Sequence, residues 1–190
     1  MAPLKASVCS ANPHKLAEFR ELFGDWDLEL LDGFGFPPED GDTYLENARI
    51  KARFGRAVGP PDRWMLADDS GIEVIALDGG PGVVTARWAE GRHVEKLLDA
   101  LDGADNRGAQ YVCELVALSP AGDEIVGTGV LRGEIAHAEA GDEGFGFDPV
   151  FVPLGETRTV AELGDAWKTE HSHRALAARA LRLAISGRSS

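Results

Sequence analysis

The sequence has no hydrophobic run long enough to cross a membrane. A membrane-spanning helix needs about 20 consecutive apolar residues, and none of the apolar runs here approaches that length. The first residues, MAPLKASVCSANPHK (1–15), also lack the longer apolar core of a secretory signal peptide. We therefore expect a globular protein of the cytoplasm that does not span membranes.

Cysteine is scarce, with two in 190 residues. Two cysteines exclude a disulfide framework and a cysteine-based zinc site of the usual kind. Both of them, Cys9 and Cys113, lie in apolar, strand-like runs. This setting is typical of buried thiols that contribute only to packing.

Positive charge is also scarce, because 19 Lys and Arg residues face 32 Asp and Glu residues, for a formal net charge of −13. Nucleic acids and anionic membranes both require a basic surface, so we expect neither as a partner. The chain has no G-x-x-x-x-G-K-[ST] motif and no G-x-G-x-x-G that opens a helix, which excludes a P-loop and a dinucleotide fingerprint. A polyanionic ligand must therefore meet a local group of cations, a metal ion, or both.

Strand-like and helix-like segments alternate along the chain, without repeats or a long linker. Asn12 and Pro13 have the order of a helix cap and first residue, and Thr43 and Glu46 have capping-box spacing. A long hairpin follows near the middle of the chain. The pattern predicts a single α/β domain over residues 1–190 with a mixed sheet. The predicted strands are 4–10, 27–32, 64–67, 72–77, 109–119 and 124–138, and the predicted helices are 13–23, 43–58, 91–103 and 172–185.

The segment ADDSG (67–71) separates two apolar runs and carries the adjacent acids Asp68 and Asp69. Acids in a turn are commonly helix caps or Asx-turn residues. Because both flanking runs are apolar enough for interior strands, we expect this turn at the end of a sheet, where α/β active sites lie. Carboxylates gathered there suit Mg²⁺, which takes one or two of them together with phosphate oxygens and water.

Two helices carry candidate phosphate ligands. Ser10, Asn12 and Lys15 surround the start of the first predicted helix, where free N–H groups and the helix dipole favour an anion. An ordinary N-cap with a solvated lysine is the alternative. On the second predicted helix, Lys51 can point into a cleft, although lysines on helices are usually solvated. Glu39, in the loop ahead of that helix, is available as a ligand.

The glycine-rich segment GFGFDP (144–149) allows a close backbone approach to a ligand and offers the rings of Phe145 and Phe147 to a base. Pro149 favours an extended conformation at Asp148. The alternative is an ordinary turn with two core phenylalanines.

The segment WKTEHSHR (167–174) places basic residues around the start of the last predicted helix. Ser172 can cap that helix, with His173 and Arg174 in its first turn and Lys168 upstream. Basic residues in a first turn oppose the helix dipole. We therefore expect them to face an anion or a polar ligand, with a surface role as the alternative.

Taken together, these segments resemble the inosine triphosphate pyrophosphatase family, the Ham1/RdgB-like nucleotide house-cleaning enzymes. The resemblance runs from Ser10 to about Arg174, nearly the whole chain. Single motifs here are weak, but their shared order makes the resemblance specific. The matching segments are SANPHK, ENARIKA, ADDSG, PGVVTARWA (81–89), GFGFDPVF and SHR.

The resemblance implies an elongated mixed β-sheet flanked by helices, with two lobes around a central active-site cleft, and usually a homodimer. It implies Mg²⁺-dependent hydrolysis of deaminated purine nucleoside triphosphates (ITP, dITP and XTP) to the monophosphate and pyrophosphate, which clears them from the nucleotide pool.

By position, the resemblance also assigns roles to individual residues. Asp69 orients or deprotonates the attacking water, with Lys51 and Asp68 as further catalytic residues. Mg²⁺ is assigned to Glu39 and Asp69. The substrate-binding residues are Ser10, Ala11, Asn12, Pro13, His14 and Lys15 for the triphosphate, and Ser70, Phe145, Gly146, Phe147, Asp148, Lys168, His173 and Arg174 for the nucleotide, chiefly its base.

The chain departs from the family pattern in two places. Ser10-Ala11 stands where Thr-Gly is commoner, and Val84 and Trp88 stand where tyrosines are frequent. Neither departure removes a proposed catalytic group. The alternatives are a non-catalytic nucleotide-binding or sensor module, a magnesium phosphatase, and a Maf-like nucleotide pyrophosphatase with another base preference.

Overall fold

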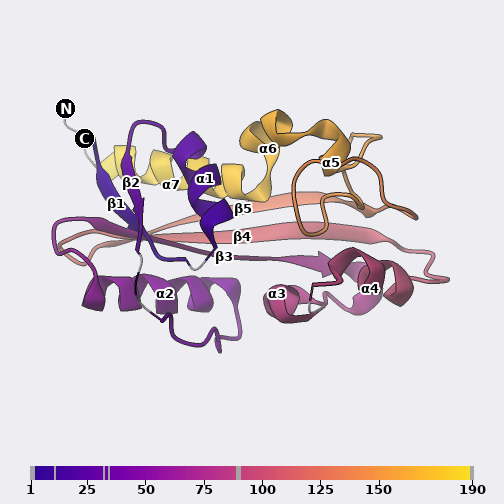
Figure 1. Cartoon of the computed structure of the whole chain (residues 1–190), viewed down its shortest axis with the longest axis horizontal. Coiled ribbons are helices and arrows are strands. Elements are labelled where there is room, and N and C mark those ends of the chain that lie inside the picture. Colours follow the sequence, from indigo (N-terminus) through magenta and orange to yellow (C-terminus); the bar gives the residue numbers. More distant parts are fainter. Residues whose placement is uncertain (1–2, 11, 32, 34, 89–90, 189–190) are drawn as a thin grey trace. The chain divides into compact units, whose positions relative to one another are not determined.

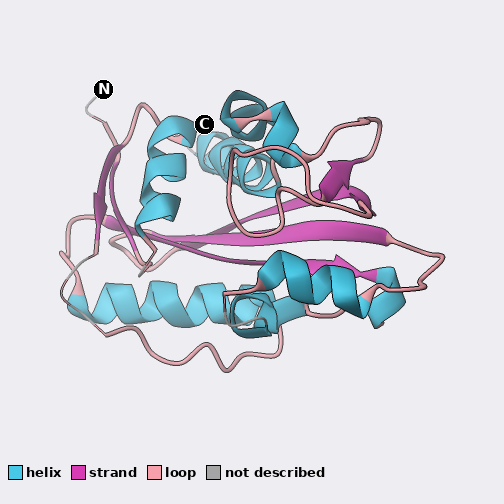
Figure 2. Cartoon of the chain, turned by 45° about the vertical axis from the view of Figure 1, so that its right-hand side comes forward, coloured by secondary structure: helices cyan, strands magenta, loops and turns pink. Residues whose placement is uncertain are grey.

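A six-stranded sheet with helices packed against it organises the computed structural model, which describes residues 3–10, 12–31, 33, 35–88 and 91–188 (Figures 1 and 2). The strand order is β2-β1-β3-β4-β5-β6. β1 (Lys5–Val8) is parallel to both β2 (Asp27–Leu30) and β3 (Trp64–Val74), whereas β6 (Phe151–Pro153) is antiparallel to β5 (Glu124–Ile135). The mixed sheet confirms the predicted α/β class.

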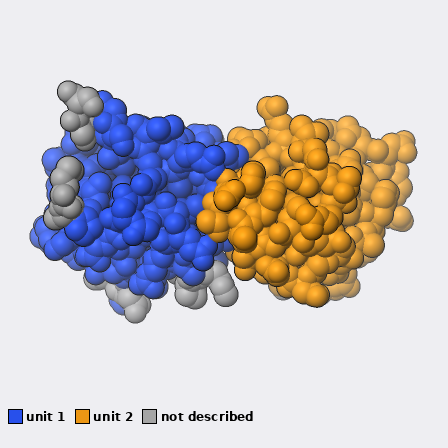
Figure 3. Space-filling model, turned by 90° about the horizontal axis from the view of Figure 1, so that it is seen from above, with its two compact units in different colours: residues 1–69, 113–129, 174–190 blue, residues 70–112, 130–173 orange. Residues whose placement is uncertain are grey.

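The chain forms two compact units (Figure 3). The first comprises residues 1–69, 113–129 and 174–190, and the second comprises residues 70–112 and 130–173. β3, β4 (Gly108–Leu118) and β5 contribute residues to both units. Among the described residues, no helix is long and apolar enough to cross a membrane.

The first unit has helices on both faces of its strands. α1 (Pro13–Leu22) and α7 (His173–Arg188) lie on one face, and α2 (Tyr44–Val58) lies on the other (Figures 1 and 2). α2 begins with the predicted capping box, in which Thr43 accepts the backbone N–H of Glu46 and the Glu46 carboxylate accepts that of Thr43. Both cysteines are buried and free, as predicted, and burial raises the pKa of each thiol to about 12.

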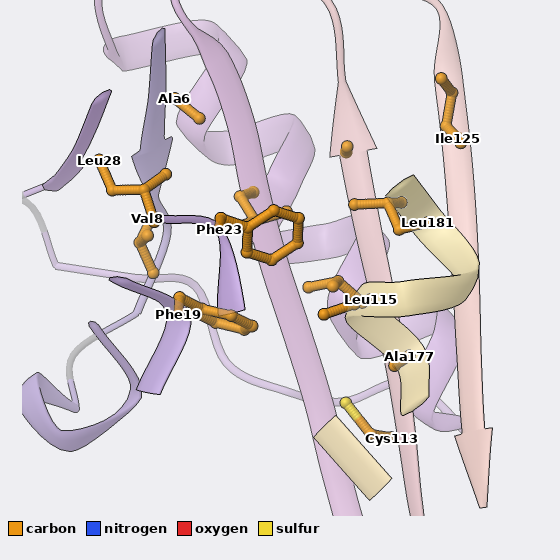
Figure 4. Close-up of a cluster of buried hydrophobic side chains, with 13 residues drawn as sticks. Ala6, Val8, Phe19, Phe23, Leu28, Cys113, Leu115, Ile125, Ala177 and Leu181 are labelled. Carbon is orange, nitrogen blue, oxygen red and sulfur yellow. The ribbon is translucent and has the colours of Figure 1, made fainter. Parts of the chain in front are cut away.

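β3 divides its side chains between two apolar cores of the first unit. Leu66 joins the core under α1 and α7, part of which Figure 4 shows, whereas Met65 and Ala67 join the core under α2. This alternation follows from the two-residue period of a strand. The predicted turn at ADDSG (67–71) is wrong, because β3 continues through it from Trp64 to Val74.

α7 approaches the sheet closely at one glycine. An ideal Cβ at Gly127 of β5 would lie 2.2 Å from the carbonyl oxygen of Ala177, so any side chain at position 127 would collide with the helix backbone. The helix accordingly packs through small residues, with Ala177 and Ala178 buried against the core. The helical spacing of the sequence predicts an inner face of α7 made of Leu176, Ala180, Leu181 and Ala184, but Ala184 is exposed.

The second unit has its own core around Phe147, Phe151 and Tyr111. In the described residues of this unit, four short α-helices and two 3₁₀ segments accompany the strands. Their bounds are Ile75–Leu77 and Gly82–Val84 for η1 and η2, Thr85–Trp88 for α3, His93–Ala100 for α4, Val160–Leu163 for α5 and Asp165–His171 for α6.

Candidate active site

The adjacent carboxylates of Asp68 and Asp69 point to opposite faces of β3. Asp68 is bonded by residues of α1 and α7, and Asp69 by residues of α2. Successive side chains of a strand alternate in this way, so the two carboxylates do not share one location. The sequence prediction of a single acidic cluster at a sheet end is therefore replaced by two carboxylates with separate partners.

Asp68 is the centre of a buried ion-pair network. Its Oδ1 accepts a hydrogen bond from the Lys15 ammonium at 2.9 Å, and its Oδ2 accepts from Nε and Nη2 of Arg174 at 3.3 and 3.2 Å. Arg174 also donates to Glu18 of α1. Asp68 is 1% exposed and Arg174 is 3% exposed. The network therefore joins α1, β3 and α7 through a fully buried pair, Asp68 and Arg174, and two partly exposed charges, Lys15 and Glu18.

The environment keeps Asp68 ionised. Burial alone would raise the pKa of Asp68, but the positive charges of Lys15 and Arg174, with Lys51 further away, hold it well below the ordinary value for aspartate. Asp68 thus serves as a permanent negative charge rather than as a group that exchanges protons at neutral pH.

We expect Asp68→Asn to lower the free energy of unfolding by about 3 kcal/mol at neutral pH, because it leaves the buried Arg174 and the partly buried Lys15 undercompensated. Since the folded-state pKa of Asp68 is lowered, its contribution is complete above the unfolded pKa of about 3.9 and is lost as the pH falls below it. Urea unfolding of the unmodified protein and of Asp68→Asn, at several pH values between about 3 and 7, measures how the stability difference changes with pH. A stability difference that stays constant over this range would contradict the assignment.

Asp69 lies among polar groups that come from α2. Its Oδ2 accepts a hydrogen bond from Nδ2 of Asn47 at 3.0 Å, and its Oδ1 lies 3.4 Å from the Lys51 ammonium. The same ammonium lies 2.6 Å from Oε1 of Glu39. Lys51 is therefore a buried cation shared by two carboxylates.

The pKa of Asp69 is shifted in the opposite direction from that of Asp68. Burial raises the pKa of Asp69, Lys51 opposes this, and the negative charge of Glu39 raises it further, so the net shift is upward. Environments that push the pKa values of two carboxylates apart are typical of acid–base sites. Asp69 is thus the better proton acceptor of the two, because a base must bind the proton it removes.

The residues around Lys51 fit a divalent cation. Glu39 and Asp69 already share one positive charge, and they offer only hard oxygen ligands, which Mg²⁺ prefers. Within the described ranges, no group of three or more His, Cys, Asp or Glu side chains is placed to hold a metal ion. Two protein carboxylates agree with Mg²⁺, which usually takes its other ligands from phosphate and water.

The cations of the first unit are matched by acids. Its described ion pairs around β3 join three cations to four carboxylates, so an anionic ligand requires additional positive charge. Ser10, which precedes α1, is buried. Its hydroxyl accepts a hydrogen bond from the backbone N–H of Asn12 at 3.1 Å. Pro13 and His14 begin α1. Ala11 and the side chains of Pro13 and His14 lie outside the described part of the structure.

In the second unit, the Asp148 carboxylate organises the glycine-rich segment. It accepts hydrogen bonds from the Lys168 ammonium at 2.9 Å, from the backbone N–H of Phe145 at 2.8 Å and from the Tyr111 hydroxyl at 3.4 Å. An ideal Cβ at Gly144, which has a φ of +80°, would lie 2.3 Å from Asp148 Oδ2. Only glycine at position 144 allows the loop to close on this carboxylate.

The two phenylalanines of this segment have different environments. Phe147 is 3% exposed and packs in the core of the second unit, whereas Phe145 is 43% exposed. The Lys168 ammonium lies 4.3 Å from the centroid of the Phe145 ring. The more exposed ring of the two is therefore that of Phe145, with Lys168 over it, and Gly146 beside it has the positive φ of +65° that the loop requires.

His173 lies against an aromatic ring in the second unit. Its imidazole stacks on Tyr111 with the ring centroids 4.7 Å apart and an interplanar angle of 13°. Arg174 follows it directly but belongs to the first unit, where it is held by Asp68. Ser70 likewise follows Asp69 in β3 and belongs to the second unit.

Three residues that contact the candidate site were given no site role from the sequence, namely Glu18, Asn47 and Tyr111, although the helical spacing predicts Asn47 on the face of Lys51. Asn47 lies four residues before Lys51, so its position on the same face of a helix was a usable signal. Glu18 lies three residues after Lys15, and this spacing is a similar but weaker signal of a shared helical face. Nothing in the local sequence marks Tyr111.

The chain is similar to known proteins over almost its whole length. The sequence matches the Ham1 family over residues 6–184. A dITP/XTP pyrophosphatase of Bdellovibrio bacteriovorus is 41% identical over 186 residues, covering 91% of this chain and 93% of the relative, and one of Streptomyces coelicolor is 40% identical, covering 92% and 93%. The structure of the Staphylococcus aureus Ham1 protein matches with a TM-score of 0.84 and 34% identity, covering 97% of this chain and 99% of that chain. The chain belongs to the Ham1 family.

Proposed function

We propose that this protein hydrolyses deaminated purine nucleoside triphosphates, such as dITP and XTP, to the monophosphate and pyrophosphate. The observation that carries the proposal is the pair of adjacent aspartates, of which one is kept ionised by Lys15 and Arg174 and the other has a raised pKa beside Lys51 and Glu39. This arrangement supplies both a proton acceptor and cations for phosphate. The names of the relatives support this choice of substrate.

In this proposal, Glu39 and Asp69 hold Mg²⁺, which when bound supplies positive charge to the phosphate oxygens. The described cations and carboxylates nearly cancel, so a triphosphate needs that added charge. The proposal therefore requires a divalent cation, with Mg²⁺ first because the donors are carboxylate oxygens.

The protein groups have distinct roles in the proposed reaction. Lys15, Lys51 and the N-terminus of α1, with Ser10 and Asn12, bind and orient the triphosphate. Asp69 accepts a proton from the attacking water. The water oxygen then forms a bond to phosphorus as the anhydride P–O bond breaks and pyrophosphate leaves. Lys51 stabilises the negative charge that develops on the departing group.

The second unit supplies the proposed base contacts. Lys168 and the backbone of the Phe145–Asp148 segment offer hydrogen-bond donors to a purine, and the exposed ring of Phe145 offers a stacking surface. Asp148 keeps Lys168 in place through their 2.9 Å ion pair. His173, Ser70 and Arg174 complete the proposed nucleotide contacts, with Arg174 acting also through Asp68.

The proposal is tested with one nucleotide panel. The purified protein is incubated with ITP, dITP, XTP, GTP, ATP and pyrimidine nucleoside triphosphates, and pyrophosphate and phosphate are measured separately. Release of pyrophosphate from the deaminated purine nucleotides is the expected result. Release of phosphate would favour a magnesium phosphatase, a pyrimidine preference would favour a Maf-like enzyme, and binding without turnover would favour a sensor.

We expect removal of divalent cations to abolish turnover. Dialysis against excess chelator should reduce pyrophosphate release from ITP to background. In such reactions a metal ion stabilises the charge of the transition state by several kcal/mol. Addition of Mg²⁺ to the same sample should restore activity and controls for damage during dialysis. Undiminished turnover in excess chelator would refute the metal assignment.

The homodimer implied by the family resemblance and the cytoplasmic location expected from the short apolar runs belong to the same proposal. So does the joint action of residues 1–190 as one functional domain. Val84 is 39% exposed and is one of the positions that differ from the family pattern. Sedimentation of the purified protein tests the dimer.

A further inference from the structure

The amide of Asn47 uses both of its ends within the candidate metal site. Nδ2 donates to Asp69 Oδ2 at 3.0 Å, and Oδ1 accepts the backbone N–H of Gly41 at 2.9 Å. Asn47 is fully buried, at 0% exposed. It therefore connects β3, which carries Asp69, to the loop that carries Glu39.

A second connection runs parallel to the first. Lys51, one helical turn after Asn47, joins Glu39 to the other oxygen of Asp69. The two connections differ in chemistry, because the lysine link consists of opposite charges and the asparagine link is a neutral amide. A cation bound by Glu39 and Asp69 would compete with Lys51 for their oxygens, but Asn47 has no charge for it to displace. The amide link is therefore the one that a bound cation can leave intact.

Gly41 shows how closely the loop is fitted to this amide. An ideal Cβ at Gly41 would lie 2.8 Å from Asn47 Oδ1 and 2.7 Å from the Cβ of Glu46. Both distances are shorter than real Cβ contacts, so a side chain at position 41 would push the loop away from α2. The absence of a side chain at position 41 thus allows the hydrogen bond that Asn47 accepts.

We propose that Asn47 is a positioning residue that holds the carboxylate of Asp69 and the Glu39 loop in the arrangement that receives the divalent cation. The inference rests on the proposed function, because it concerns the metal of that reaction. Hydrogen-bond partners of metal ligands orient those ligands, and their loss typically lowers metal affinity by about 10–100-fold. Asn47 touches neither the substrate nor the metal in this role, since both of its polar ends are bonded to protein.

The test compares Asn47→Ala with the unmodified protein. Binding of Mn²⁺ to the nucleotide-free protein is measured by electron paramagnetic resonance, and the half-saturating Mg²⁺ concentration is measured with ITP. We expect both the Mn²⁺ dissociation constant and the half-saturating Mg²⁺ concentration to rise about 10–100-fold. At saturating Mg²⁺, the KM for ITP should change much less. A purely structural role would lower the amount of folded protein without shifting the metal dependence.

Asn106→Ala is the matched control, because Asn106 Oδ1 also accepts a glycine N–H, that of Gly108, at 3.0 Å in the second unit. It should leave the metal dependence unchanged. If Asn47→Ala does not fold, Gly41→Ala retains the amide and displaces the loop, and it should raise the same two metal constants. Unchanged constants in a folded Asn47 or Gly41 variant would overturn the inference alone. Absence of metal binding and of metal dependence in the unmodified protein would overturn the proposed metal site itself.

Discussion

Asp69→Asn is expected to lower kcat for pyrophosphate release by about 10²–10⁴-fold, the usual effect of removing a general base. The amide has nearly the shape of the carboxylate but cannot accept the proton and is a weaker metal ligand. The fold should persist, because the raised pKa of Asp69 shows that its environment disfavours the charge that the substitution removes. Steady-state kinetics at saturating Mg²⁺, together with thermal unfolding, measures both effects.

Asp68→Asn is the matched control, since it makes the same chemical change one residue earlier on the opposite face of β3. It removes the partner of Lys15 and Arg174, so its main effect should be on stability. The two substitutions thus separate a group that exchanges protons from a group that holds cations in place. If folded Asp69→Asn kept more than about a tenth of the activity, the general base would have to be another residue.

The second large effect concerns the base of the nucleotide. We expect kcat/KM for ITP or XTP to exceed that for ATP by about 10²–10⁴-fold. A 6-keto purine presents an acceptor at O6 and a donor at N1, so a donor such as the Lys168 ammonium or a backbone N–H is well matched to O6. Adenine presents an amino group there, and each unpaired, desolvated polar group costs about 1–3 kcal/mol.

Guanine is the stricter comparison, because it shares O6 and N1–H with hypoxanthine. Rejection of GTP requires that the second unit leave no room or no partner for the 2-amino group. We expect GTP to be a poor substrate as well. Comparable kcat/KM values for ITP, GTP and ATP would overturn the assignment of the base contacts even if the metal site proved correct.

Substitutions at the basic residues should alter this preference. Arg174→Ala should lower activity and reduce the preference, but it also removes a partner of Asp68 and Glu18, so it should lower stability too. Lys168→Met is the more specific test, because Lys168 pairs with Asp148 within the second unit. It should reduce the ratio of ITP to ATP turnover with little change in the metal dependence. An unchanged ratio in both variants would place base selection elsewhere.

Local sequence patterns determined the helices α1, α2, α4 and α7 and the chemical groups of the site, whereas the short helices α3, α5 and α6 were not predicted. The capping box of Thr43 and Glu46 marks the start of α2 because the bonds involved span only three residues. The four-residue spacing of Asn47 and Lys51 places both on one helical face for the same local reason. The acids and bases of the proposed site were therefore recognisable before their contacts were known.

The tertiary structure decided how these groups are used. The turn-forming residues of ADDSG remain in a strand, with β1 and β4 as its sheet neighbours, and this pairing outweighs their local preference for a turn. A continuous strand sends Asp68 and Asp69 to opposite faces, which a turn would not require. Arg174 reaches Asp68 across 106 residues, from the helix α7 that packs closely against β5 at Gly127. A contact of this kind depends on packing between distant segments, so no local pattern could have predicted it.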